Sequence, residues 1–227
     1  MDKFFVCLAN SYKYGNRCVA GILVNLFPKE KRFTVELDHD GHPLWIRPIN
    51  RNTEGGAIPT NDVQDFAEFD IIKASNVEKV PETGAQSENY YYERLEKIED
   101  IYSIPSHVNS FEDSYHETIL GNRGSAVPVD VYSRLNHSIM FVMVEKGEFY
   151  LKNREETGQI PQPRGRFTYK GVEYDLPVTD PIWRHLVETD INRANSMGGG
   201  YYFMTLSLAI EQNGWHSKLI SMVCPGF

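Results

Sequence analysis

The residues with the clearest capacity for binding chemistry lie near the start of the chain. Asn10, Ser11, Lys13 and Arg17 place an amide, a hydroxyl and two cations around a glycine-containing turn. Backbone amides of such a turn, together with cationic side chains, can hold a phosphate or a carboxylate. The same residues also suit a hairpin loop in which Asn and Ser side chains bond to their own backbone. Both interpretations stay open at this stage.

A second candidate pair is Trp45 and Arg47. Because they are two residues apart on a predicted strand, their side chains face the same side of it. An Arg beside an indole can hold the phosphate of a base that stacks on the ring, as in single-strand-binding proteins. The alternative is structural: Trp45 fills the barrel core and Arg47 pairs with an acid such as Glu88.

A third polar group is formed by Gln86, Glu88 and Asn89. Amide side chains supply both donors and acceptors, so these residues suit the reading of base edges or ribose hydroxyls. Equally, Asn89 suits the cap of a following helix or a brace for the linker. Lys218 is also a candidate ligand-binding residue. Ser207, His216 and Lys218 lie on two adjacent predicted strands, so their side chains could converge.

Catalysis is weakly supported. A hydrolase triad of Ser207, His216 and Asp180 is possible by residue type, but Ser207 lies in mid-strand and no Gly-x-Ser-x-Gly elbow is present. Thr179 and Asp180 are expected to cap the helix that follows them. The sequence therefore favours a protein that is not an enzyme, with an enzyme acting on nucleic acid or nucleotides as the alternative.

Metal and cofactor chemistry is weaker still. The segment from Asp38 to His42 gathers Asp and His residues, but a turn of this composition needs no metal. The chain has no H-E-x-x-H, paired-cysteine, EF-hand or Walker pattern. We expect neither a metal nor a cofactor.

Composition bounds the class of protein. With 227 residues, 41% hydrophobic and 24% charged, the chain is an ordinary globular protein, which excludes disordered and fibrous classes. Its cysteines, Cys7, Cys18 and Cys224, cannot complete a disulfide framework, which favours a reducing compartment. No stretch approaches the roughly 20 apolar residues of a membrane span. We therefore expect a cytoplasmic protein with no membrane partner.

The net charge of −8 is unevenly distributed. Residues 1–50 hold seven Lys and Arg against five Asp and Glu, residues 51–120 hold five against fifteen, and residues 121–227 hold eleven against eleven. The acidity belongs to the middle segment, so a local basic face for an anionic ligand is still possible. The acidic segment also suits a protein-interaction module that docks on a basic partner.

Short strands dominate the predicted secondary structure. The expected strands are Lys3–Ala9, Arg17–Leu26, Arg32–Leu37, Leu44–Ile49, Phe66–Lys73, Ser138–Val144, Phe149–Lys152, Arg166–Tyr169, Val172–Leu176, Tyr201–Ala209 and Ser217–Cys224. Gly21 is expected at a bulge or bend, and residues 145–148 as a hairpin turn. Helices are expected over Ser87–Tyr102 and from Pro181 to about Ala194. The two halves show no mutual sequence repeat.

Ordered landmarks carry a resemblance to a known family. Ala9-Asn10-Ser11, Arg17-Cys18-Val19-Ala20-Gly21, Trp45-Ile46-Arg47-Pro48, Gln86-Ser87-Glu88-Asn89 and His216-Ser217-Lys218 resemble elements of the dual OB-containing domain family of prokaryotes. The resemblance spans nearly the whole chain. It implies two OB-type barrels and the recognition of nucleic acid or a nucleotide, in a defence or mobile-element context.

The sequence thus predicts a mainly β protein of two OB-fold-like small barrels joined by a partly helical connector. The expected boundaries are 1–95 for the first barrel, 96–123 for the connector and 124–227 for the second barrel, which carries one helix. The expected function is non-catalytic recognition of nucleic acid or a nucleotide-derived ligand. Lys13, Arg17 and Arg47 would hold phosphates, Trp45 would stack on a base, and Asn10 with Ser11 would orient the turn.

Overall fold

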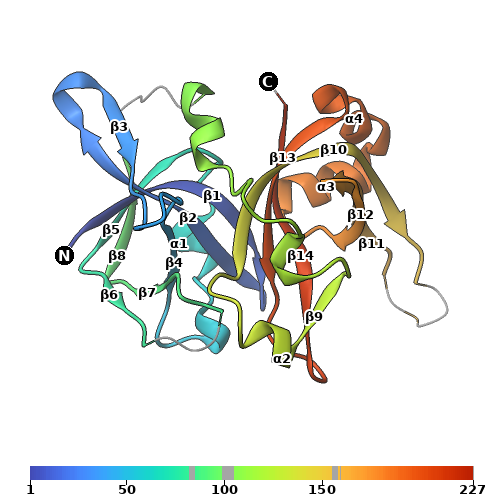
Figure 1. The fold of residues 1–227 in the computed structure, drawn as a ribbon, viewed down its shortest axis with the longest axis horizontal. Helices are drawn as coiled ribbons and strands as arrows, with labels where there is room; N and C mark the ends of the chain where they lie inside the picture. The colour runs from blue at the N-terminus through green and yellow to red at the C-terminus, as the bar shows by residue number, and fades with distance from the viewer. Residues whose placement is uncertain (82–84, 99–104, 155–157, 159, 227) are drawn as a thin grey trace. The chain divides into compact units, whose positions relative to one another are not determined.

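The computed structural model describes residues 1–81, 85–98, 105–154, 158 and 160–226 (Figure 1). The protein is mainly β, as expected, and its strands form two sheets. The chain divides into two compact units, Met1–Asp113 and Ser114–Phe227, whose boundary falls inside the stretch expected as a connector. Cys7, Cys18 and Cys224 are free thiols. Among the described residues, no helix is long and apolar enough to cross a membrane.

The first unit is built on an eight-stranded sheet. Its strands are β1 (Lys3–Lys13), β2 (Asn16–Phe27), β3 (Arg32–Val35), β4 (Trp45–Ile49), β5 (Ile71–Ser75), β6 (Glu78–Lys79), β7 (Asn89–Tyr91) and β8 (Arg94–Lys97). A short helix, α1 (Thr60–Val63), lies between β4 and β5, and 3₁₀ segments occur at Pro28–Glu30, Glu54–Gly56 and Pro105–Phe111.

This sheet curls round on itself. The strand order is β6-β7-β4-β2-β1-β5-β8, and β7 pairs in parallel with β4 while β8 pairs with β5. Strands β7 and β8 are separated only by Tyr92 and Glu93, so one nearly continuous stretch of chain pairs with β4 near one end of the order and with β5 near the other. The enclosed core includes Phe5, Val19 and Ile46. The result is a small OB-like barrel, and α1 is tied to β1 by the hydrogen bond from Asn10 to the Val63 carbonyl.

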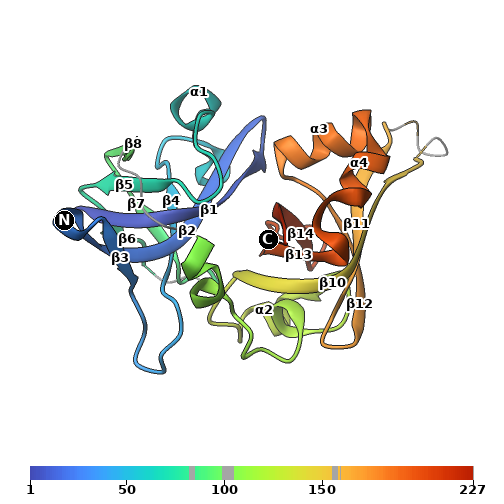
Figure 2. The ribbon, with the colours of Figure 1, turned by 90° about the horizontal axis from the view of Figure 1, so that it is seen from above.

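The second unit contains a six-stranded sheet in the order β12-β11-β10-β13-β14-β9. Its elements are β9 (Ala126–Pro128), α2 (Val129–Tyr132), β10 (Ile139–Lys152), β11 (Gln162–Tyr169), β12 (Val172–Pro177), α3 (Pro181–Thr189), α4 (Ile191–Ser196), β13 (Tyr201–Leu208) and β14 (Trp215–Pro225). Figure 2 shows α3 and α4 side by side at one end of this unit. Further 3₁₀ segments are Ile119–Gly121 and Met197–Gly200.

Helix α3 packs its aromatic residue onto the second core. The Trp183 ring meets the Phe149 ring edge-on with centroids 5.1 Å apart, and Phe149 meets Tyr202 in the same way at 5.4 Å. Asp180 caps the helix as predicted, since its Oδ1 accepts hydrogen bonds from the backbone N–H groups of Ile182 and Trp183. Asp190 interrupts the predicted single helix and caps α4.

Both units share one connectivity. In the first, β1 pairs with β2 and β5, β2 pairs with β4, and β4 runs parallel to β7, which leads directly into the last strand, β8. In the second, β10 pairs with β11 and β13, β11 pairs with β12, and a parallel bridge joins Val178 to Ile220 of the last strand. A helical segment follows the third barrel strand in each. The repeat in topology has no counterpart in the sequence.

Three predicted elements were wrong. Over Ser87–Tyr102 the described part forms strands β7 and β8 instead of a helix, because the run Tyr90–Tyr92 favours extended structure in a sheet; residues 99–102 lie outside the described chain. The strand expected at Phe66 begins only at Ile71, after a turn in which the Ala67 N–H donates to the Asp70 carboxylate.

The third error is the hairpin expected around residues 145–148. Strand β10 runs through this region without reversing, with a bulge between Glu145 and Glu148. The residues Glu145-Lys146-Gly147-Glu148 suggested a turn; in the structure Lys146 does take a positive φ of 56°, but within the bulge of a continuous strand. Gly147 is required because a Cβ there would lie 2.4 Å from the Tyr202 ring. The turn-like residues therefore serve a strand that crosses closely over a core aromatic.

Candidate functional site

The β1–β2 hairpin carries most of the predicted binding residues. Its turn is only Tyr14 and Gly15, with φ of 49° and 74°, so both strands extend further than the sequence indicated. Two consecutive residues with positive φ are typical of a tight type I′ connection. Ser11 and Lys13 are therefore strand residues, and no open turn pocket exists among Asn10, Ser11, Lys13 and Arg17.

Pairing separates these four residues into two faces. Asn10 lies opposite Val19 and Tyr12 opposite Arg17, so Asn10 and Arg17 share the face that lines the barrel core. Ser11 lies opposite Cys18, so Ser11 and Lys13 point to the outer face. The prediction that all four surround one anion was wrong in this respect.

Asn10 has a structural contact at the inner face. Its Nδ2 donates hydrogen bonds to the backbone oxygens of Val63 and Phe66, at 2.8 and 2.9 Å, and so ties β1 to the α1 segment. Arg17 reaches back along the same face, where its guanidinium lies 4.5 Å from the centroid of the Tyr12 ring. Tyr12 and Tyr14 are 44% and 51% exposed, so this end of the hairpin joins accessible aromatic rings to a cation.

Lys13 is the most unbalanced charge of the hairpin. Burial lowers its pKa, and the nearby Arg47 cation lowers it further, while Cys18 acts in the opposite direction. Within the described chain, the Lys13 ammonium makes no hydrogen bond or ion pair. A half-buried cation of this kind gains stability from an added anion, because the anion restores the solvation that burial removes.

Arg47 is committed to a buried ion pair. Its Nη2 lies 2.8 Å from the Glu88 Oε1, and the two side chains are only 4% and 3% exposed. The strands support the pair, since the Arg47 N–H also donates to the Glu88 carbonyl at 2.7 Å. The structural alternative for Arg47 is therefore confirmed. Trp45 lies on the same face of β4 as Arg47, and its Nε1 donates a hydrogen bond to the Asp113 carboxylate at 3.3 Å.

Gln86 and Asn89 hold each other. Asn89 Nδ2 donates to Gln86 Oε1 at 2.9 Å, and the Asn89 N–H donates to the Gln86 carbonyl at 3.4 Å. Asn89 begins strand β7, so it does not cap a helix. These contacts brace the loop that leads into β7, which corresponds to the second interpretation of this motif.

Lys218 is buried inside the second unit and is 0% exposed. Its Nζ donates to the backbone oxygen and the Oδ1 of Asn122, at 2.7 and 2.8 Å, and lies 5.2 Å from the Tyr174 ring centroid. Burial lowers the pKa of Lys218 to about 7. Lys218 therefore braces the loop before β9, and the prediction that it contacts an external ligand was wrong.

Comparison with protein families decides the relationship. The model of the dual OB-containing domain matches residues 3–223. The chain belongs to this family. The family description agrees with two mainly β units of one connectivity, and it confirms the resemblance drawn from the ordered motifs.

Solved structures similar to this dual OB domain are distant. The p204 HINb domain shares 10% identity over 97% of this chain and 91% of that chain, with a TM-score of 0.36. A Replication Protein A heterotrimer bound to ssDNA shares 8% identity over 100% of this chain and 49% of that chain, also at 0.36. The single-stranded DNA binding protein from Thermus aquaticus shares 11% over 100% and 93%, at 0.25. No curated protein matches the sequence.

The possible triad of the dual OB domain is not assembled. Ser207 Oγ lies 2.5 Å from Ser221 Oγ, and His216 Nδ1 lies 2.9 Å from the Ala209 carbonyl while its ring stacks on Tyr132. Asp180 is occupied by its helix cap and by the Val223 N–H at 3.0 Å. Each of the three residues thus supports a different part of the second barrel.

The Asp38–His42 segment forms the predicted turn. Asp38 Oδ1 accepts hydrogen bonds from the N–H groups of Asp40 and His42, both at 2.9 Å. The bond from His42 is the largest reason that the pKa of Asp38 is lowered. Ligand atoms of Asp38, Asp40 and His42 lie within 4.8 Å of one another, so a cation would find donors here. The turn's own hydrogen bonds already account for this arrangement.

One polar surface was missed by sequence reasoning. On the outer face of β11, Arg164 donates from Nε to Asp175 at 2.8 Å, and Tyr150 donates its hydroxyl to the same carboxylate at 2.6 Å. The Arg166 guanidinium lies 5.5 Å from the Tyr150 ring centroid. The alternation of Arg164 and Arg166 with core residues was the available signal. Tyr150 and Asp175 could not be predicted from the sequence, because only the pairing register of β10, β11 and β12 places them beside Arg164 and Arg166.

Proposed function

We propose that this dual OB domain binds nucleic acid, without chemical change, at the end of its β1–β2 hairpin. The observation that carries the proposal is that Lys13 is a half-buried cation with no anionic partner in the described chain. The Arg47 cation lies near it. A phosphate is the anion that nucleic acid supplies at every nucleotide, and Lys binds it as a point charge.

The aromatic rings of the hairpin support a polymer over a free anion. Tyr12 and Tyr14 are exposed, and Arg17 lies over the Tyr12 ring. Single-stranded nucleic acid is held by stacking of bases on such rings and by cations that follow the backbone. In this proposal Lys13 and Arg17 hold phosphates, while the two tyrosines replace Trp45 as the stacking surface.

The proposal is tested by fluorescence anisotropy with labelled single-stranded DNA, duplex DNA and single-stranded RNA at two salt concentrations. The double variant Lys13→Ala/Arg17→Ala is expected to lose binding and its salt dependence, because both phosphate contacts are removed. A matched control is Lys152→Ala/Arg193→Ala, which removes two exposed cations from the second unit and should bind normally.

The outcome is read against the fold of each variant. Unchanged affinity in a folded Lys13→Ala/Arg17→Ala protein would remove the hairpin from consideration. Equal loss in the Lys152→Ala/Arg193→Ala control would show a general effect of net charge, which the proposal does not allow. Circular dichroism of both variants confirms that the barrels are intact.

The acidic middle segment is less suited to a basic partner than its charge suggests. Several of its acids are already paired inside the first unit, including Asp70 with Lys97 at 2.9 Å and Glu96 with Arg94 at 2.9 Å. Glu78 likewise pairs with Arg51. These pairs reduce the charge available for docking, so the hairpin is the better-supported site.

A further inference from the structure

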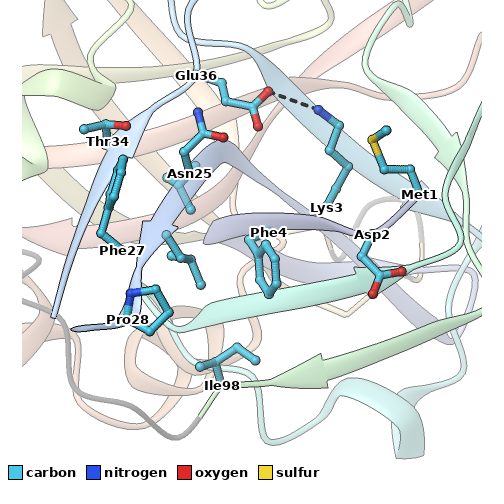
Figure 3. Close-up of a pocket in the computed structure, with 12 residues that line it drawn as sticks. Met1, Asp2, Lys3, Phe4, Asn25, Phe27, Pro28, Thr34, Glu36 and Ile98 are labelled. Carbon is cyan, nitrogen blue, oxygen red and sulfur yellow. Dashed lines mark hydrogen bonds and ion pairs between the residues drawn. The ribbon is translucent and has the colours of Figure 1, made fainter. Parts of the chain in front are cut away.

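A cavity of about 780 Å³ lies at the other end of β1 and β2 from the hairpin (Figure 3). Its walls come entirely from the first unit: the start of β1, the end of β2, β3 and Ile98. The volume falls within the range of small-molecule sites, and the mouth of a β-barrel is a common place for one. The cavity takes no part in the proposed nucleic-acid binding.

The inward face of the barrel becomes polar where it meets this cavity. Phe5 and Leu23 are core residues. Strand alternation places Lys3 on the same face as Phe5, and Asn25 on the same face as Leu23. Asn25 lies directly opposite Thr34 on β3. Figure 3 shows Lys3 and Glu36 meeting across the cavity, where their ion pair measures 3.1 Å. Asn25 and Thr34 are exposed, and Lys3 and Glu36 are half-buried, so their polar groups are accessible from the open side of the cavity.

Asn25 and Thr34 offer hydrogen bonds to a ligand. Neither side chain makes a hydrogen bond to any residue that the structure describes. An amide carries a donor and an acceptor in one plane, and a hydroxyl adds either role. Such an amide can bond in a bidentate manner to the edge of adenine.

The remaining walls suit a flat ring. Phe4 and Phe27 both line the cavity, with Pro28 and Ile98 beside them (Figure 3). The Arg32 guanidinium lies 4.1 Å from the centroid of the Phe27 ring. Aromatic walls with an amide edge favour a planar heterocycle over a sugar or an aliphatic chain.

Positive charge gathers beside the cavity. The turn after Phe27 carries Lys29 and Lys31, and Arg32 begins β3; all three are exposed. Glu30 pairs with Arg32, while Lys29 and Lys31 make no ion pair with any described residue. Lys29 and Lys31 do not line the cavity, but they follow its lining residue Pro28 closely in the chain, so two cations are near it for an anionic group attached to the ring.

We propose that this cavity binds a purine mononucleotide. The base lies against Phe4 and Phe27, its edge meets Asn25 and Thr34, and its phosphate meets Lys29 and Lys31. The proposal is independent of the proposed nucleic-acid function, because the two sites share no residue.

Isothermal titration calorimetry with AMP, adenosine and ribose 5-phosphate tests the proposal. AMP is expected to bind, with adenosine and ribose 5-phosphate each weaker by about tenfold or more because each lacks one half of the contacts. Asn25→Leu should weaken AMP by about tenfold, and Lys29→Gln/Lys31→Gln should weaken AMP without changing adenosine. Asn61→Leu, at an exposed position of α1, is the matched control and should bind AMP normally.

Several results would overturn the site. No binding of AMP at millimolar concentration removes it, as does AMP binding that survives both Asn25→Leu and Lys29→Gln/Lys31→Gln. Ribose 5-phosphate binding as tightly as AMP contradicts a base pocket. The Lys13→Ala/Arg17→Ala variant should keep its full AMP affinity, so failure of the hairpin proposal and failure of this one are distinguishable.

Discussion

The Arg47–Glu88 pair shows how burial decides between two roles that a sequence motif leaves open. Trp-Ile-Arg-Pro suits either base recognition or a structural pair, and only the exposed fractions of 4% and 3% reveal the second. A buried charge must keep its partner, because the loss of that partner leaves an uncompensated ion in a medium of low dielectric constant. Arg47 therefore joins β4 to the residue that precedes β7 instead of offering its charge to a ligand.

This role predicts an uneven mutational response. Glu88→Gln should lower the free energy of unfolding by about 3 kcal/mol, since the Arg47 charge stays buried. The double replacement Arg47→Met/Glu88→Leu should cost less than Glu88→Gln alone. Urea denaturation measures each value, with Glu78→Gln as a control on an exposed pair that should cost at most about 1 kcal/mol. Similar small losses for Glu88→Gln and Glu78→Gln would contradict the structural role.

The division of the hairpin residues between two faces could not be predicted from spacing. Phe5 and Cys7 line the core, and uninterrupted alternation would place Ser11 and Lys13 there as well. The pairing shifts by one residue between Cys7 and Ala9, so that Asn10 faces the core instead. A bulge of this kind depends on how two strands cross, and Gly21 gave its approximate position without showing which strand carries it.

Among the elements, a glycine in the second strand of each barrel permits the close crossing of the first. A Cβ on Gly21 would lie 1.9 Å from the Val6 carbonyl oxygen of β1; one on Gly165 would lie 3.0 Å from the Phe149 ring of β10 and 2.7 Å from the Ile220 side chain of β14. Backbone cannot give way as easily as a side chain, so the two sites differ in tolerance. The two barrels thus solve one topological problem with glycine, although their sequences show no repeat.

These distances predict a graded series of alanine substitutions. Gly21→Ala should destabilise most, by about 3 kcal/mol or more, because the neighbouring strand must move. Gly165→Ala should cost about 1–3 kcal/mol through displaced side chains. Gly124→Ala, where the nearest contact would be an ordinary 3.5 Å, is the control and should change stability by less than about 0.5 kcal/mol. Thermal unfolding gives the order, and equal effects at Gly21 and Gly124 would refute it.

Strand segments were predictable where local pattern and tertiary environment agree. The hairpin of β11 and β12 followed from alternation around Lys170 and Gly171, and α3 followed from its Asp180 cap. Prediction failed where the partner strand was decisive. Ser87–Tyr102 has helix-like charge spacing, yet β7 pairs with β4 and β8 pairs with β5, and pairing outweighs propensity.

For the molecule as a whole, the net negative charge is concentrated in the first unit. Residues 1–113 hold 12 Lys and Arg against 19 Asp and Glu, while residues 114–227 hold 11 against 12. Both proposed sites therefore lie in the more acidic unit, where only local cations can attract a phosphate. This favours few ionic contacts, so binding at the hairpin should depend on salt through about two phosphates and not through a broad basic surface.

The stability of the whole chain should pass through a maximum at alkaline pH. Burial lowers the pKa of Lys218 from 10.5 to about 7, so between these values the unfolded chain binds the extra proton and stability rises with pH. Burial raises the pKa of Cys7 from 9.0 to about 12 and that of Tyr92 from 10.0 to about 12. The folded chain keeps these two protons longer, so stability falls as pH rises above about 9 to 10.

Urea unfolding as a function of pH measures this balance. From pH 7 to pH 9 the free energy of unfolding should rise by about 2 kcal/mol, because the proton on Lys218 is released on one side of the equilibrium only. Above pH 10 it should fall. In Lys218→Met the rise should shrink to the small part that the lowered pKa of Lys13 contributes, while the alkaline fall persists, since Cys7 and Tyr92 are unchanged. A rise of equal size in Lys218→Met would assign the effect to another group and would refute the buried-lysine account.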